Sequence, residues 1–206
     1  MPPFPSKVRP VITEFIDMAL KATIFKAELQ ISDMGRNYYH DHSLTIARHP
    51  SENDERMMVR LLAFALHAHE DLAFAEGMST DDEPAVWRKD MTGAIELWIE
   101  VGQPDGKRIR KACGRARQVV VYSFSGRSAD VWWNQVQKDL EGLKNLTVIN
   151  LLPGAGPELA KLAQRTMKLQ CTIQDGQVWM TDNNDTVHVD MSGGTLRRCE
   201  TQGIRQ

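Results

Sequence analysis

Carboxylates gather in one stretch of the chain, residues 81–103, at a spacing that could hold a metal ion. Three acids precede Pro84 in this stretch: Asp81, Asp82 and Glu83. Proline keeps the preceding residue extended and favours strand starts, so these acids should lie at the start of a strand. A hard cation such as Mg²⁺ takes a few carboxylate oxygens and leaves its other positions to water and phosphate. We therefore expect Asp82 or Glu83, together with Glu100, to hold Mg²⁺ or Mn²⁺.

The second half of this stretch alternates with a period of two, which predicts a strand. Its apolar residues fall on one face: Ile95, Leu97, Ile99 and Val101. The other face carries Glu96 and Glu100 on either side of Trp98. Because strands rich in Ile and Val are buried on at least one side, the acids need a reason to be there.

The order of these acids resembles the PD-(D/E)XK nuclease superfamily. There, an acid after a proline on one strand and an acid-x-Lys triplet on the next strand hold the metal. This chain departs from the pattern twice, with Ala85 after Pro84 and with Gly102 two positions after Glu100. Gln103 or a basic residue on the next helix would replace the missing lysine. The alternative reading is a solvated acidic turn followed by an ordinary edge strand.

The clearest helix is predicted over residues 54–69, where apolar residues recur at helical spacing. Acids in its first turn suit the positive end of the helix dipole. The superfamily resemblance implies that an acid on the first helix can reach the metal, which makes Glu55 a further candidate ligand. A surface glutamate that complements the dipole is the alternative.

One block of the chain is strongly basic, although the formal net charge is −2. The interval from Gly106 to Ala129 contains no acid and seven cations: Lys107, Arg108, Arg110, Lys111, Arg115, Arg117 and Arg127. The net charge argues against tight, indiscriminate duplex binding, which neutralises many phosphates. A single basic block can still present one phosphate-facing surface. We assign nucleic-acid contacts to four of its members, Lys107, Arg108, Arg115 and Arg117.

Six longer runs, in order along most of residues 18–190, resemble the YaeQ family of bacterial proteins. They are MALKATIFKAELQISDM, SENDERMMVRLLAFALHA, GMSTDDEP, IELWIEVGQPD, RKACGRARQVVVY and LQCTIQDGQVW. The resemblance implies a variant of the PD-(D/E)XK fold with an acidic site and no established biochemical activity.

The element pattern predicts an α/β (α+β) fold, a central mixed sheet flanked by helices with added β-hairpins. A hairpin is expected from strands 21–33 and 38–47, and a hairpin pair over 168–190. Helix 104–115 between strands 95–101 and 118–124 predicts a right-handed parallel crossover. The remaining elements are helix 129–143, strand 145–152 and helix 157–167.

Length and composition favour one globular domain over residues 18–192, with a flexible extension at 1–17 and a disordered tail at 193–206. No apolar run approaches the length of a membrane span, so we expect no membrane association. The three cysteines are scattered without metal-binding spacing, which fits a reducing cytoplasm.

Two functions follow as hypotheses. In the first, the chain is a nuclease in which the metal activates water and neutralises the scissile phosphate, Gln103 orients that water, and Lys111 or Arg110 stabilises the pentavalent phosphate. In the second, the chain is a non-catalytic module that binds nucleic acid or a protein partner through the basic helix. If Glu100 proves to be the buried partner of an arginine, the second hypothesis is favoured.

Overall fold

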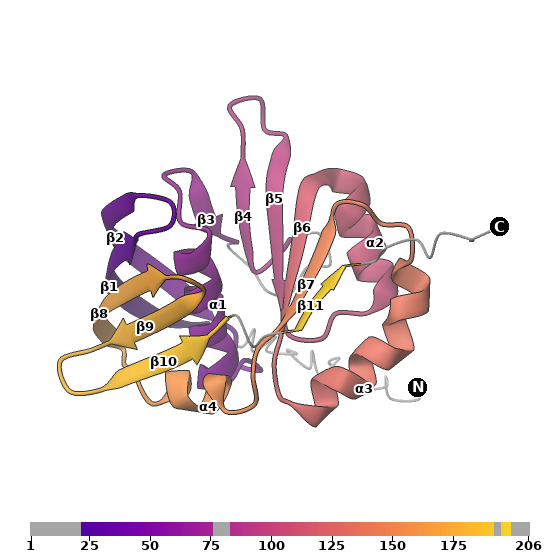
Figure 1. The fold of residues 1–206 in the computed structure, drawn as a ribbon. Coiled ribbons are helices and arrows are strands. Elements are labelled where there is room, and N and C mark those ends of the chain that lie inside the picture. The colour runs from indigo at the N-terminus through magenta and orange to yellow at the C-terminus, as the bar shows by residue number, and fades with distance from the viewer. Residues whose placement is uncertain (1–21, 76–82, 192–194, 199–206) are drawn as a thin grey trace, which may run out of the picture.

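The computed structural model describes residues 22–75, 83–191 and 195–198, the last of these as backbone only. Two β-sheets lie on either side of helix α1 (Asp54–Leu66), and further helices cover the outer face of one sheet (Figure 1). Nine consecutive residues of α1, Met57–Ala65, are buried. A helix that is buried on all sides must pack against more than one element, and the main core accordingly joins α1 to strands of both sheets.

The first sheet has six strands in the order β11-β7-β6-β5-β4-β3. Their bounds are β3 Leu72–Phe74, β4 Val86–Lys89, β5 Ile95–Val101, β6 Ala116–Ser123, β7 Leu146–Asn150 and β11 Thr195–Arg198. The three central strands β5, β6 and β7 are parallel. This confirms the predicted adjacency of the Glu100 strand and the following strand, and it excludes an edge position for β5.

The face of this sheet opposite α1 is covered by two helices, α2 (Gly106–Arg115) and α3 (Arg127–Val136). A short 3₁₀ helix, η1 (Gln137–Leu140), continues from α3. A second core cluster fills this layer and includes Trp98, Ile109, Val119 and Trp132. The predicted polar face of β5 is therefore buried beneath α2, because the crossover helix packs back onto the strand that it follows.

The second sheet has five strands in the order β10-β9-β8-β1-β2. Their bounds are β1 Thr23–Asp33, β2 Tyr38–Arg48, β8 Thr166–Gln174, β9 Gln177–Thr181 and β10 Thr186–Asp190. Each predicted hairpin forms as expected. The prediction of one central sheet with added hairpins is wrong in its arrangement, since β1 and β8 pair in parallel and join the hairpins into a sheet of their own. Local patterns carry no signal for a pairing between such distant segments.

Two further expectations need correction. The helix predicted over 157–167 is the shorter α4 (Ala155–Ala160), because Thr166–Gln174 alternates between exposed and buried residues as a strand does. Residues 195–198 fall in the segment predicted to be a disordered tail, yet they form β11. Pairing with β7 satisfies backbone groups at the edge of the first sheet. Within the described ranges, no helix is long and apolar enough to span a membrane.

Candidate functional site

Glu100 is a buried carboxylate, with 2% of its surface exposed. Its Oε1 accepts hydrogen bonds from the indole Nε1 of Trp98 and from Nε of Arg108, both at 2.8 Å. Its Oε2 accepts a longer bond of 3.3 Å from Nη2 of Arg108. Glu100 and Arg108 thus form a bidentate, charge-assisted pair. Its hydrogen bonds replace those that a carboxylate loses with water on burial.

Arg108 is held in place from three directions. It lies in the first turn of α2, where the side chain of Asp105 caps the helix by accepting from the backbone N–H of Arg108. Its Nη2 also donates to the backbone carbonyl of Glu83 at 2.6 Å. The guanidinium therefore connects the helix, the buried strand β5 and the segment that leads into β4.

Burial raises the pKa of the Glu100 carboxyl, and the neighbouring Arg108 and Trp98 offset part of that rise. Desolvation disfavours the charged form, while the cation and the hydrogen-bond donors favour it. Arg108 thus favours the charged form of this buried carboxyl.

A second buried acid, Glu52, lies at the start of α1 between two arginines. Its Oε1 accepts from Nη1 of Arg56 at 3.2 Å and its Oε2 from Nη2 of Arg60 at 2.9 Å. Arg56 also donates through Nε to the backbone carbonyl of Val101, at the end of β5. Arg56 therefore links this second ion pair to the strand that carries Glu100.

A cleft of about 560 Å³ opens where the two ion pairs meet. It lies at the carboxyl ends of β5 and β6, the edge at which open α/β sheets bind ligands. Its lining residues are Ser51, Asn53, Arg56, Glu100, Val101, Gly102, Gln103, Pro104, Arg108, Phe124 and Ser125. The N-termini of three helices reach this cleft, since Asn53 caps α1, Pro104 precedes the cap of α2 and Ser125 precedes the cap of α3. Helix N-termini carry partial positive charge and attract anions.

Gly102 and Gln103, which follow shortly after Glu100, shape this cleft. Gly102 has φ +102°, a conformation that L side chains rarely adopt, and it turns the backbone out of β5. Gln103 then bridges to the next strand by donating from Nε2 to the carbonyl of Phe124 at 3.1 Å. Its Oε1 accepts from Ser128 at 3.3 Å, so Gln103 lines the cleft with both ends of its amide engaged.

Of the predicted metal ligands that the structure describes, Glu55, Glu83 and Glu100, only Glu100 lines the cleft. Glu83 approaches through its carbonyl, and Asp81 and Asp82 lie outside the described residues. Glu55 points elsewhere, because its carboxylate lies against Gly156 of α4. Within the described ranges, no group of three or more His, Cys, Asp and Glu side chains could hold a metal ion.

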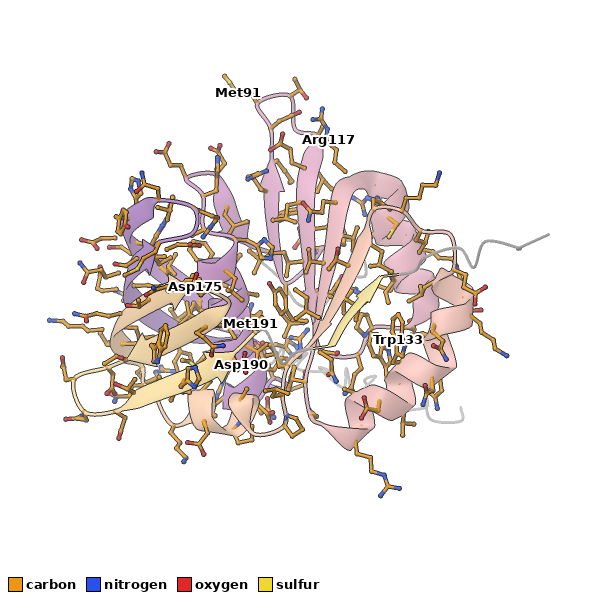
Figure 2. All side chains as sticks on the ribbon, viewed as in Figure 1. Met91, Arg117, Trp133, Asp175, Asp190 and Met191 are labelled. Carbon is orange, nitrogen blue, oxygen red and sulfur yellow. The ribbon has the colours of Figure 1, made fainter. Side chains whose placement is uncertain are left out.

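The predicted basic residues do not form one surface. Arg108 lines the cleft and Lys107 is an exposed residue in the first turn of α2, while Arg110 turns away to the carbonyl and carboxylate of Asp139. Arg115 and Arg117 flank the residue that pairs with Ile95, at the opposite end of β5. Figure 2 shows Arg117 at the same end of the molecule as Met91.

This division of the basic block follows from strand and helix length. The six residue steps of β5, from Ile95 to Val101, cover roughly 20 Å. Arg117 and the cleft therefore lie at opposite ends of this strand. Arg117 lies 3.9 Å from Glu96, and Arg115 stacks over the ring of Trp98. Lys111 is exposed in the middle of α2.

The model of the YaeQ protein family matches residues 18–191 of this chain. The chain belongs to the YaeQ family. It is 45% identical over 175 residues to uncharacterized YaeQ proteins of Salmonella typhi and Escherichia coli (strain K12), which covers 85% of this chain and 97% of each relative. The resemblance of the six sequence runs to the YaeQ family is thereby confirmed.

Two crystal structures of YaeQ proteins share the architecture. The protein from Xanthomonas axonopodis pv. citri is 48% identical with a TM-score of 0.80, covering 87% of this chain and 99% of that one. The protein from Pseudomonas syringae is 36% identical with a TM-score of 0.80, covering 87% and 97%. These YaeQ relatives are not named for an activity, so the function must be argued from the site.

Sequence reasoning missed Glu52, Arg56 and Arg60, three of the five charged residues in the two ion-pair groups at this YaeQ cleft. Their spacing of four residues was visible, and it places Arg56 and Arg60 on one face of the helix with Glu52 just before its start. Only the fold shows that this face is buried and that Arg56 reaches the end of β5.

Proposed function

We propose that the chain is a non-catalytic nucleic-acid-binding module that keeps a PD-(D/E)XK-like architecture and receives a phosphodiester backbone in the cleft beside Glu100. The observation that carries this proposal is the Glu100–Arg108 pair. The oxygens of Glu100 already accept three hydrogen bonds, two from Arg108 and one from Trp98. A metal ion could bind this carboxylate only by displacing a guanidinium that also donates to the carbonyl of Glu83, on an arginine whose backbone N–H is bound by Asp105.

The charges around the cleft favour an anion. Three guanidinium groups, those of Arg56, Arg60 and Arg108, stand against two carboxylates, those of Glu52 and Glu100. The same cleft lies beside three helix N-termini, whose partial positive charge attracts anions. Phosphate oxygens accept from guanidinium groups and backbone N–H groups alike, and such contacts fix position without reading sequence.

Binding would be measured with fluorescent single-stranded DNA, duplex DNA and single-stranded RNA over a series of salt concentrations. Lys107→Ala and Arg117→Ala form a matched pair, because each removes one exposed cation, at opposite edges of the sheet. Lys107→Ala should weaken binding and reduce the salt slope by about one, while Arg117→Ala should leave both unchanged. Equal effects of the two variants would refute a site at the cleft.

The nuclease remains a second candidate, for one specific reason. The bond from Arg108 to the carbonyl of Glu83 brings Glu83 to the same end of the sheet as Glu100. With Mg²⁺ or Mn²⁺ bound by Asp82 or Glu83 and Glu100, the chain would cut phosphodiester bonds.

One variant separates the two candidates. Glu100→Gln removes a negative charge from the cleft, so a binding module should bind nucleic acid more tightly and cut nothing, with Mn²⁺ or with chelator. A nuclease should show metal-dependent cleavage in the wild type and lose it in Glu100→Gln.

A further inference from the structure

A stretch of β8 lacks a strand on one side among the residues that the structure describes. β8 spans Thr166–Gln174 and pairs with β1 from Thr166 to Ile173, but its pairing with β9 covers only Gln170–Gln174. The chain leaves β9 at Thr181 and turns into β10. Residues 166–169 therefore form an open notch inside the five-stranded sheet.

The backbone of this notch offers hydrogen-bonding groups in a defined direction. Lys26 donates from its backbone N–H to the carbonyl of Arg165, so Arg165 faces β1. Successive residues of a strand point their backbone groups to opposite sides. The N–H and C=O groups of Thr166 and Lys168 therefore face the notch, and within the described ranges they have no recorded backbone partner there.

Two hollows flank this same stretch, and Lys168 and Leu169 line both of them. The first, of about 370 Å³, lies over the outer face of the sheet and is lined by Glu28, Asp41 and Asp182 as well as Lys168. The second, of about 250 Å³, is lined mainly by uncharged side chains, among them Gln164, Thr166 and Asn184. The turn at Asp182 and Asn183 borders both hollows.

We propose that this notch binds an extended peptide segment of a partner protein as an added strand, with a lysine or arginine side chain in the first hollow. Addition of a strand draws affinity from main-chain hydrogen bonds, and pockets for alternate side chains provide specificity. A residue opposite Lys168 would point to the outer face, and its neighbour would point into the second hollow. Three carboxylates against one lysine leave the first hollow with a net charge of −2, which selects a cation.

This proposal is independent of nucleic-acid binding at the cleft, since the notch belongs to the other sheet. The probe is a capped hexapeptide of alternating threonine and lysine, with a threonine and glutamate hexapeptide as its charge-reversed control. Binding to the full chain would be followed by NMR, together with hydrogen exchange of the Thr166 and Lys168 amides. These amides should exchange freely in the chain alone and become protected by the lysine peptide.

Two single variants at Lys168 and one double variant make the test specific. Lys168→Pro removes the N–H that faces the notch and should abolish binding, whereas Lys168→Ala keeps that N–H and should bind as well as the wild type or better. Glu28→Gln with Asp41→Asn should weaken the lysine peptide about tenfold, because two of the three carboxylates are neutralised. The far-ultraviolet spectrum and thermal melt of each variant check that it remains folded.

Any of four outcomes would overturn the proposal. Three of them are equal binding of the two peptides, undiminished binding by folded Lys168→Pro, and Thr166 and Lys168 amides already protected in the chain alone. The last result would mean that a segment of this chain itself fills the notch. Absence of binding at millimolar peptide to the folded wild type would count equally against it.

Discussion

The two sheets of this protein treat the same residue type in opposite ways. Glu100 on β5 is covered by α2 and accepts three hydrogen bonds, whereas Glu28 on β1 lies on an open face and accepts one, from Ser43. Both glutamates alternate with apolar residues in their strands. The difference shows that strand pattern places an acid on a face, while the layer above that face decides whether the acid needs a fixed cation.

The largest effect is expected from removing that cation. Arg108→Ala leaves Glu100 buried without its partner and should destabilise the fold by about 3–5 kcal/mol. Chemical denaturation would measure the loss, with the adjacent exposed Lys107→Ala as the control that should change little. A loss below about 1 kcal/mol would mean that water reaches Glu100 in the layer between β5 and α2.

The next effect concerns pH and a partly buried histidine that contacts the covered sheet. His67 contacts the hydroxyl of Tyr122 through Nε2 at 2.8 Å, and burial lowers its pKa from 6.5 to about 4. Because the unfolded chain binds this proton more readily, the stability from neutral His67 is complete above pH 6.5 and is lost as pH falls towards 4. The loss should reach about 3 kcal/mol.

The measurement is the difference in unfolding free energy between the wild type and His67→Gln across this pH range. Glutamine can keep a hydrogen bond to Tyr122 but does not titrate, so the difference isolates the histidine. A difference that is constant with pH would contradict a partly buried, neutral His67.

A smaller loss of stability is expected in both sheets when the N-cap of α1 is removed, since α1 packs between them. Asn53 caps α1 by accepting from the backbone N–H of Arg56 at 2.9 Å. Asn53→Ala should therefore cost about 1 kcal/mol. Hydrogen exchange should report the loss in β1 and β6 alike, and Ser51→Ala serves as the control. A loss confined to one sheet would show that the sheets unfold separately.

The smallest effect belongs to the open sheet. Glu28→Gln should change stability by no more than about 0.5 kcal/mol, because an exposed acid loses little water on folding. Chemical denaturation would compare the stability of Glu28→Gln with that of Glu100→Gln. Similar losses of stability in the two variants would contradict the difference between the two sheets.

Local elements were largely readable from the sequence. Period-two alternation located β5 and the hairpin strands, and the helical repeat located α1. The parallel pairing of β5 with β6 followed from a strand, a helix and a strand in succession, since such connections are right-handed and short. The acid Glu100 was likewise predicted as a site residue, and so was the rule that an arginine partner would favour binding over cleavage.

The partners of these residues were decided by tertiary structure. The basic block of residues 107–117 is contiguous in sequence, yet the helix and strand that carry it send Arg108 to the cleft and Arg117 to the opposite edge. The union of two hairpins through β1 and β8, the burial of Glu52 between two arginines and the notch beside Lys168 all arise from long-range packing. Sequence alone determined which faces are apolar, because side-chain periodicity is local. Only the fold decided what covers each face, because that depends on segments far apart in the chain.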